Sequence, residues 1–217
     1  ERRQVNPPAP PPVLTGAEFE WIRRFLFEQT GISLKEGKQA LVSGRLDRRL
    51  RHYQATSYME YFSKLGAAGN EAETTLAIDL LTTNETYFMR EPKHFEYIKK
   101  HILPHYGGDK MFRAWSAASS TGEEAYTLAM TAFDVLGADG WEIIGTDIST
   151  RVVAQAKRGL YPIAATEKLP GAWLKKYCLK GKKDYKDFFT IRDELRNNVS
   201  FYQANLLHPL PSFGRFD

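Results

Sequence analysis

MFRAWSAASSTGEEAYTLAM, residues 111–130, holds a short apolar run, a stretch of small residues and the start of an amphipathic pattern. The run 111–116 predicts a buried strand, and the pattern from Glu123 to Leu136 is typical of a helix. The small residues between them form a loop. A strand that leads through a short loop into a helix indicates one unit of a parallel α/β sheet.

The same alternation continues along the chain. WEIIGTD, residues 141–147, predicts a second strand, and the helix after it is capped by Ser149 and ends near Arg158. Residues 199–203 predict a third strand. Three strands are few for a parallel sheet with exposed edges, so we expect the Rossmann-like domain, residues 92–217, to be incomplete at its C-terminal end.

The alternation is interrupted over residues 162–198. Short apolar runs at 173–179 and 188–191 flank the polar segment GKKDYKD, residues 181–187. Runs of this length are typical of short strands. We therefore expect a small antiparallel β-subdomain inserted into the α/β domain.

The N-terminal part of the chain is predicted to be all helical. Thr15–Glu18 and Ser57–Glu60 are capping boxes, in which two side chains satisfy free backbone N–H groups at a helix start. Apolar residues recur at helical spacing through residues 15–82. The expected helices of this all-α domain are 15–31, 37–53, 57–66 and 71–81.

Two segments flank the helical domain. Residues 1–14 are rich in proline and are expected to be a disordered tail. Residues 83–91 join the helical domain to the sheet and are expected to contribute to the active site. Pro92 suits the start of the next helix, which we expect to run to about Ile102.

Composition excludes several classes of protein. The single cysteine, Cys178, allows no intrachain disulfide and no cysteine zinc site, which is typical of a reducing compartment. No apolar run approaches the roughly 18 residues of a membrane span, so we expect a cytoplasmic protein without membrane insertion. The net charge of +4 and the isoelectric point of about 9.0 suit nucleic acid or an acidic protein surface, and do not choose between them.

The loop after the first strand is a candidate cofactor site. It lies at the carboxyl end of a parallel strand, where open α/β sheets bind ligands, and its small side chains, Ala117 among them, allow close approach to the backbone. There is no GxGxxG, and two glutamates, Glu123 and Glu124, open the helix. Carboxylates there suit the helix dipole but repel a pyrophosphate, so the ligand should be cationic or carry hydroxyls and an amine, and S-adenosylmethionine has both a sulfonium and an amino group. The alternative is an ordinary turn between strand and helix.

Asp147 ends the second strand. A carboxylate at this position can accept hydrogen bonds from the two hydroxyls of a ribose. The alternative is that Asp147 only caps the helix that follows. Ser149 can perform that role as well.

The segment LTTNETYFMR, residues 81–90, has more polar and aromatic residues than a passive linker requires. Arg90 can hold a substrate carboxylate with its planar guanidinium. The alternative is a hinge in which Arg90 is solvated or paired with Glu91.

The second predicted helix carries cations on one sector, beside its apolar face. A partner that presents glutamates could dock there, although a solvated helix face is the alternative. Nucleic acid suits this sector less well, because aromatic residues are not interleaved with the cations and no nucleic-acid motif is found. The candidate docking residues are Lys38, Arg45, Arg48, Arg49 and His52.

Four motifs in sequence order make the chain recognisable. They are LTTNETYFMRE at 81–91, WSAASSTGEEAYTLAM at 115–130, IGTDIS at 144–149 and ANLL at 204–207. In this order and spacing the chain resembles the chemotaxis receptor glutamate methyltransferases, the CheR family, over roughly residues 15–217.

The resemblance implies that S-adenosylmethionine is the methyl donor, that S-adenosylhomocysteine is the product, and that the substrates are glutamates on cytoplasmic helices of chemoreceptors. It implies that Arg90 is catalytic and that the helical domain docks on the receptor, with no nucleic acid as partner and a monomer as the expected state. The implied cofactor-binding residues are Asn84, Thr86, Arg90, Ala117, Glu124, Asp147, Ile148, Asn205 and Leu206.

Two features depart from the family pattern. The family continues past the final Phe216-Asp217 with a motif that completes its catalytic apparatus. Members that capture a receptor pentapeptide carry glycines where this chain has GKKDYKD, so pentapeptide tethering is not expected here. A glutamate, with an ordinary pKa of about 4.3, is ionised at neutral pH, so methyl transfer to it needs no general base.

Two other functions are compatible with the sequence. A chain that binds the cofactor without turnover would be a regulatory module of a chemosensory pathway. A methyltransferase of small molecules or nucleic acid would share the loop and the acid, but would not bind receptor helices through its N-terminal domain.

Overall fold

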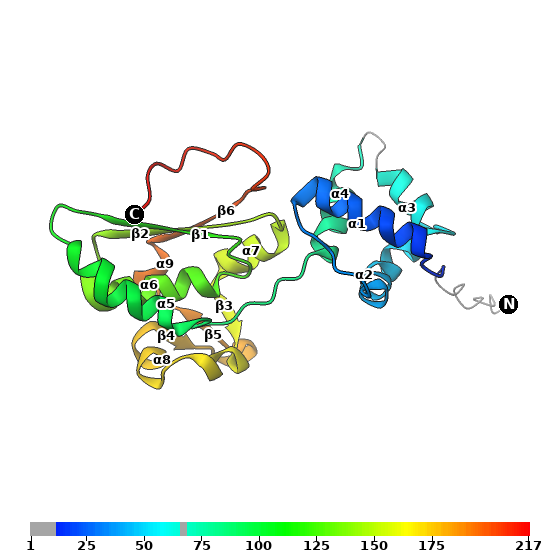
Figure 1. Ribbon diagram of the computed structural model, residues 1–217. Coiled ribbons are helices and arrows are strands. Elements are labelled where there is room, and N and C mark those ends of the chain that lie inside the picture. Colours follow the sequence, from blue (N-terminus) through cyan, green and yellow to red (C-terminus); the bar gives the residue numbers. More distant parts are fainter. Residues whose placement is uncertain (1–11, 66–68) are drawn as a thin grey trace. The chain divides into compact units, whose positions relative to one another are not determined.

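The computed structural model describes residues 12–65 and 69–217. Contacts divide the chain into two compact units, Glu1–Thr83 and Asn84–Asp217 (Figure 1). Residues 1–11 of the expected disordered tail lie outside the described residues. Within the described ranges, no helix is both long enough and apolar enough to cross a membrane.

The first unit is a bundle of helices, as expected. Its described elements are α1 (Gly16–Thr30), α2 (Gln39–His52), α3 (Tyr58–Leu65) and α4 (Glu71–Leu81). The capping box at Thr15 is present, since Thr15 and Glu18 exchange side-chain to backbone hydrogen bonds. The buried faces of these helices form one apolar core, whose largest members include Phe19, Leu46 and Tyr58.

The second expected capping box is only half correct. The Ser57 hydroxyl accepts the backbone N–H of Glu60, but the Glu60 carboxylate turns back to Thr56, whose backbone N–H it accepts at 2.7 Å. The Thr56 hydroxyl also donates to the same carboxylate oxygen. Thr56 therefore offers the Glu60 carboxylate two donors, whereas the backbone N–H of Ser57 would offer one. This explains why the carboxylate binds Thr56 and not Ser57.

The second unit contains the expected parallel sheet. Strands β1 (Phe112–Ala117), β2 (Trp141–Asp147) and β6 (Val199–Gln203) pair in the order β1-β2-β6, all parallel. Helix α6 (Glu123–Leu136) packs on β1 and β2, and α7 (Thr150–Arg158) packs on β2 and β6 (Figure 1). The apolar strand runs and the capping residue Ser149 made these five elements predictable, and the predicted α/β fold class is confirmed.

The helix expected from Pro92 to about Ile102 is not a single α-helix. The α-helical part is α5 (Pro92–Tyr97). A π-helical turn, η1 (Ile98–Ile102), and a 3₁₀ turn, η2 (Leu103–His105), follow it. Pro104 lacks a backbone N–H and therefore cannot continue an α-helical ladder.

The small antiparallel sheet is present and has the order β3-β5-β4. Its strands are β3 (Leu160–Pro162), β4 (Cys178–Lys180) and β5 (Phe188–Ile191), so it begins two residues before the expected insertion. The apolar run 173–179 is mostly helix α8 (Gly171–Tyr177) rather than strand. The other short elements are η3 (Ile163–Lys168), η4 (Lys183–Tyr185) and α9 (Asp193–Arg196).

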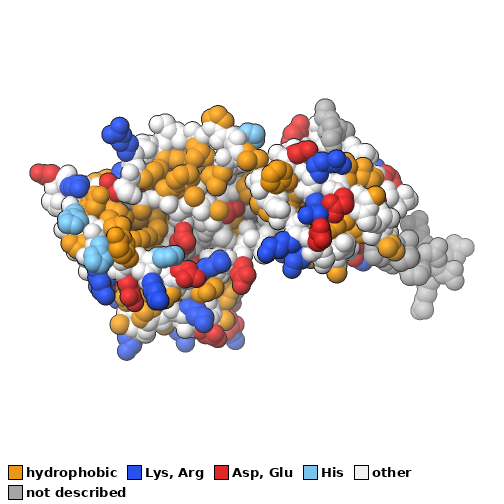
Figure 2. All heavy atoms as spheres, viewed as in Figure 1, with side chains coloured by type: hydrophobic (Ala, Val, Ile, Leu, Met, Phe, Trp, Pro, Cys, Tyr) orange, Lys and Arg blue, Asp and Glu red, His pale blue; other side chains and the backbone are white. Residues whose placement is uncertain are grey.

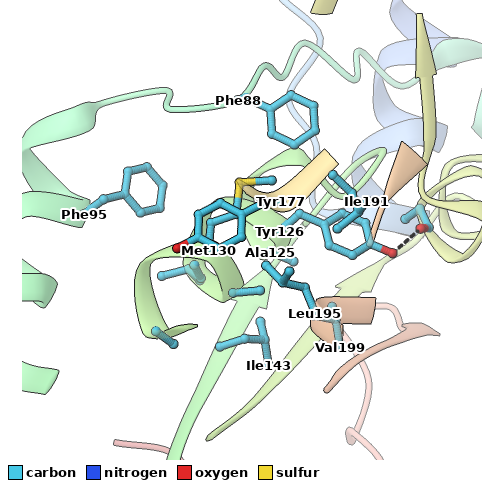
Figure 3. Close-up of a cluster of buried hydrophobic side chains, with 14 of the residues drawn as sticks. Phe88, Phe95, Ala125, Tyr126, Met130, Ile143, Tyr177, Ile191, Leu195 and Val199 are labelled. Atoms are coloured by element: carbon cyan, nitrogen blue, oxygen red, sulfur yellow. Dashed lines mark hydrogen bonds between the residues drawn. The ribbon is translucent and has the colours of Figure 1, made fainter. Parts of the chain in front are cut away.

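One apolar core joins the two sheets of this unit. Figure 3 shows Phe88 from the segment before α5, Tyr126 and Met130 from α6, and Ile191 from the small sheet in this core. Phe88 and Ile191 are fully buried. The small sheet is therefore not an independent appendage but shares the core that supports β1, β2 and α6.

Candidate active site

The candidate site lies at the carboxyl edge of the parallel sheet. The loops after β1, β2 and β6 all leave the sheet at this edge, because the three strands run in the same direction. Backbone hydrogen bonds join these loops. The N–H of Ser119 donates to the Thr146 carbonyl at 2.8 Å, and the N–H of Ala204 donates to the Asp147 carbonyl at 2.9 Å.

The loop after β1 has a constrained backbone. Ala118, Ser120 and Gly122 have φ angles of 57°, 50° and 94°, in the left-handed region that non-glycine residues seldom adopt. A Cβ atom at Gly122 would lie 2.9 Å from Cβ of Ala156 and 3.0 Å from Cζ of Phe201. Only glycine can therefore bring the start of α6 this close to α7 and β6.

Asp147 is held by two backbone amides. The N–H of Ser120 donates to Oδ2 at 2.8 Å, and the N–H of Ser149 donates to Oδ1 at 3.0 Å. The side chain of Ser149, not that of Asp147, caps α7 by accepting the N–H of Val152. Asp147 thus orders both the loop after β1 and the turn after β2. Each carboxylate oxygen still has a second lone pair for a ligand hydroxyl.

The two glutamates at the start of α6 have different surroundings. Glu123 is buried and accepts the hydroxyl of Thr121 at 2.6 Å, and burial raises the pKa of its carboxyl. Glu124 is exposed and accepts the hydroxyl of Ser116 at 2.7 Å. Of the two, Glu124 is the carboxylate that a ligand over the loop can reach.

The segment before α5 is anchored on the loop and on α6. The hydroxyl of Ser120 donates to the Asn84 carbonyl at 3.3 Å, and the N–H of Met89 donates to the Thr127 hydroxyl at 3.2 Å. Phe88 is fully buried in the core. These three contacts hold the segment that carries Asn84 and Arg90 against α6 and against the loop after β1, residues 118–122, which is the candidate cofactor loop.

Arg90 is presented by a strained backbone. Its neighbours Met89 and Glu91 have φ angles of 59° and 56°, and strain of this kind concentrates at functional sites. The Arg90 side chain is exposed, and its Nη1 donates to the Glu85 carbonyl at 2.8 Å. The local partner of Arg90 is therefore a backbone carbonyl five residues back, and not the Glu91 carboxylate considered from the sequence.

The remaining assigned residues lie in the same unit. Thr86 is half-buried in the segment before α5, and Ala117 is exposed at the end of β1. Ile148 is half-buried, and its carbonyl accepts the amide of Gln203 at 3.3 Å. Leu206 is exposed, while Asn205 is half-buried with its side-chain oxygen accepting the N–H of Leu207.

Sequence reasoning missed the residues that support this site. Phe88 and Thr127 position the Arg90 segment, and the backbone N–H groups of Ser120 and Ser149 position Asp147. The one sequence signal for these supporting residues is the aromatic side chain of Phe88, two residues before Arg90. Backbone donors leave no mark on residue identity, so they cannot be read from a sequence.

The candidate docking sector on α2 divides into two groups. Arg45 donates to the carbonyls of Leu81 and Thr82 at 3.0 and 2.9 Å, which satisfies the end of α4. Arg49 forms a two-pronged ion pair with the buried Glu73. Both arginines therefore have partners inside the first unit.

The other three residues of the sector, Lys38, Arg48 and His52, are exposed. On the face seen in Figure 2, the basic side chains of this unit lie among acidic ones and do not form a field of one sign. A partner that docks on α2 would therefore meet Lys38, Arg48 and His52 first.

The described ranges contain no cluster of three or more His, Cys, Asp or Glu side chains placed to hold a metal ion. A cavity of about 560 Å³ lies along β6 and α9, with Phe201 and Arg196 in its wall, and none of the assigned cofactor residues lines it. The carboxyl edge thus remains the candidate site on the grounds of donor chemistry, not of cavity volume.

Comparison with known proteins identifies the family of the chain. Residues 84–217 match the family described as CheR methyltransferase, SAM binding domain, and residues 17–82 match its all-alpha domain. The chain is 38% identical over 196 residues to the chemotaxis protein methyltransferase of Salmonella typhimurium, which covers 89% of this chain and 67% of that protein.

Two further relatives are similar over the same part of the chain. Chemotaxis protein methyltransferase 2 of Pseudomonas aeruginosa is 38% identical, with 89% of this chain and 69% of that protein covered. The chemotaxis protein methyltransferase of Escherichia coli K12 is 37% identical, with 89% and 68% covered. With both parts of the family matched in order on an all-α unit and an α/β unit, the chain belongs to the CheR family of S-adenosylmethionine-dependent methyltransferases.

Proposed function

We propose that this CheR-family methyltransferase esterifies glutamate side chains on the cytoplasmic helices of a chemoreceptor. The observation that carries the proposal is the Asp147 carboxylate at the carboxyl edge of the sheet, fixed by the amides of Ser120 and Ser149. The names of the relatives support the chemotaxis assignment. The single buried cysteine, Cys178, supports a cytoplasmic location.

The donor set of the loop suits S-adenosylmethionine. Asp147 keeps acceptor capacity on both oxygens for ribose hydroxyls, and the small residues 116–122 leave the backbone accessible. Glu124 is an exposed carboxylate at the start of α6, where an amino group or a sulfonium gains a charge partner. Ala117, Ile148, Asn205 and Leu206 border the same edge and are proposed to contact the nucleoside.

When bound, S-adenosylmethionine supplies an electrophilic methyl group on a positively charged sulfur. The protein's own residues then have to align an acceptor carboxylate and exclude water, since a glutamate is already ionised at neutral pH and needs no base. We propose that Arg90, Asn84 and Thr86 perform this alignment, with Arg90 catalytic. The anchored segment 84–91 holds these three residues without help from the ligand.

Arg90 is suited to orient the acceptor rather than to bind it tightly. A guanidinium presents a rigid fork that a carboxylate can match with two hydrogen bonds. One of its nitrogens already donates to the Glu85 carbonyl, which limits how far the side chain can follow the substrate. Restricted contact of this kind favours catalysis, because tight binding of the ground state gives no rate.

The helical unit is proposed to meet the receptor. Lys38 at the start of α2, and Arg48 and His52 on it, are exposed, and a receptor helix that presents glutamates for methylation would offer carboxylates to this sector. Charge of opposite sign steers association and fixes orientation more than it adds affinity. Arg45 and Arg49 support this sector by holding α2 to α4.

A methyl-transfer assay tests the proposal. The intact protein is incubated with S-adenosylmethionine carrying a labelled methyl group and with a receptor cytoplasmic fragment, in parallel with a fragment whose candidate glutamates are changed to glutamine. We expect label on the first fragment only, in a base-labile ester. Label on RNA or on a small metabolite, or none on receptor despite cofactor binding, would contradict the proposal.

A further inference from the structure

Tyr161 lies at the junction between the small sheet and the candidate cofactor loop. It is the middle residue of β3, is 1% exposed, and donates its hydroxyl to the Thr121 carbonyl at 2.7 Å. Burial raises the pKa of Tyr161 well above its usual value, so the hydroxyl stays protonated and remains a donor. Thr121 directly precedes Gly122, the residue with which the loop turns into α6.

The Tyr161 hydroxyl also borders Gly122 itself. A Cβ atom on that glycine would lie 3.1 Å from the hydroxyl oxygen. The hydroxyl thus binds the carbonyl of the peptide bond between Thr121 and Gly122 and occupies the space where a side chain at Gly122 would begin. A shift of this peptide would move the turn in which Ser120 binds Asp147.

The ring of Tyr161 contacts the other half of the site. It packs edge-on against Phe88 with ring centroids 5.0 Å apart, and it lies 5.7 Å from the ring of Phe189 on β5. Phe88 anchors the segment that carries Arg90. One buried side chain of the small sheet therefore contacts both the cofactor loop and the Arg90 segment.

We infer that Tyr161 is a positioning residue for the methyltransferase reaction, whose hydroxyl holds the cofactor loop in its binding conformation. The inference rests on the proposed cofactor site. It gives the inserted small sheet a second role besides packing, because β3 supplies the donor that fixes the loop. Neither the hydroxyl nor the ring needs to touch the substrate for this role.

The chain offers a matched control for the hydroxyl. Tyr126 on α6 is also 1% exposed, and its hydroxyl donates to the Ala156 carbonyl at 3.0 Å, so it binds α7 and not a carbonyl of the loop. Tyr161→Phe and Tyr126→Phe each remove one buried hydroxyl that donates to a backbone carbonyl. A general loss of stability would affect both variants, whereas only the Tyr161 hydroxyl binds a carbonyl of the loop.

The experiment uses the intact protein and three variants, Tyr161→Phe, Tyr126→Phe and Asp147→Ala. Calorimetry with S-adenosylhomocysteine gives cofactor affinity, and hydrogen exchange at the amides of Ser119 and Gly122 reports loop order without any ligand. For Tyr161→Phe we expect a Kd raised roughly threefold to tenfold and faster exchange at both amides, with the KM for receptor unchanged. For Tyr126→Phe we expect wild-type affinity and exchange.

The outcomes separate the inference from the proposed site. Loss of binding in Asp147→Ala, with Tyr161→Phe matching Tyr126→Phe in affinity and exchange, would overturn the role of Tyr161 and leave the site intact. Normal binding in Asp147→Ala would overturn the site itself. Faster loop exchange in Tyr161→Phe, even at an unchanged melting temperature, supports the role, because a purely structural loss would not be confined to this loop.

Discussion

The backbone nitrogen of Ser120 lies 2.8 Å from Oδ2 of Asp147, so the loop after β1 is tied to the acid that ends β2. The same carboxylate accepts the N–H of Ser149 through its other oxygen. A charged acceptor with two backbone donors is fixed in orientation. The acid that we assign to the ribose is therefore positioned before any cofactor binds.

Removal of the Arg90 guanidinium should separate binding from chemistry. We expect Arg90→Ala to bind S-adenosylhomocysteine within about threefold of wild type, and kcat to fall roughly tenfold to a hundredfold, because a charge-assisted contact to the acceptor is lost. Calorimetry and initial rates of methyl transfer measure the two effects. Lost affinity at full kcat would assign Arg90 to the cofactor alone.

Gly122→Ala should damage the fold at the site. The new Cβ would be strained by the φ angle of 94° and would press on Ala156, so we expect a loss of about 2 to 5 kcal/mol in the free energy of unfolding. Gly37→Ala is the control, since its φ is 76° with nothing within 4 Å of the added atom. Gly37→Ala should lose only about 1 to 2 kcal/mol in the free energy of unfolding, because it adds backbone strain but no steric clash. Equal losses in urea unfolding would mean that close packing at Gly122 is unimportant.

Arg45 and Arg48 lie three residues apart on α2 and should behave differently. Arg45→Ala removes the donor to two carbonyls at the end of α4, and we expect a loss of about 1 to 3 kcal/mol in stability. Arg48→Ala should leave stability unchanged and weaken receptor binding roughly twofold to fivefold, with less effect at high salt. Thermal melts and binding titrations test both. Unaltered receptor binding in Arg48→Ala at low salt would remove the sector as a docking surface.

The pair Arg49 and Glu73 should make the protein sensitive to acid. Burial opposes ionisation of Glu73, but hydrogen bonds from Arg49 and Tyr61 outweigh it and hold the pKa of the carboxyl below its usual value. A group with a lowered folded pKa stabilises above its unfolded pKa, and this stability is lost as the pH falls through the folded value. Unfolding free energy should therefore decrease below about pH 4.5 more steeply for wild type than for Glu73→Gln.

The comparison for this prediction is Glu20→Gln, in which the replaced side chain is 61% exposed and pairs with Arg23 on the same helix. Its acid profile should match that of wild type, because an exposed pair contributes little. If Glu73→Gln also kept the wild-type slope, the acid sensitivity would have to come from other carboxylates.

Elements with strong local signals could be predicted from the sequence. Helix α6 spans Glu123–Leu136 as expected, because small residues precede it and a glycine, Gly137, follows it. Strand β2 ends at Asp147 as expected, because a polar residue stops its apolar run. The fold class and the order of its two parts followed from such local patterns.

Features that depend on distant partners could not be predicted. Arg49 looks like a surface cation of α2 until Glu73, 24 residues later, is placed beside it. Tyr161 looks like one residue of a short strand until the fold brings it to Thr121, 40 residues earlier. The run 173–179 predicts a strand but is mostly helix α8, because seven residues contain too few turns for the helical period to be distinguished.

The most direct test of the account is calorimetry of S-adenosylhomocysteine binding to Asp147→Ala. The control is Asp193→Ala, which removes a carboxylate that is 82% exposed. Its ion pair with Arg196, at 3.4 Å, is a surface pair that contributes little. The account predicts no measurable binding to Asp147→Ala, wild-type binding to Asp193→Ala, and native circular dichroism for both. Binding to a folded Asp147→Ala variant within about threefold of wild type would contradict the placement of the cofactor at this edge of the sheet.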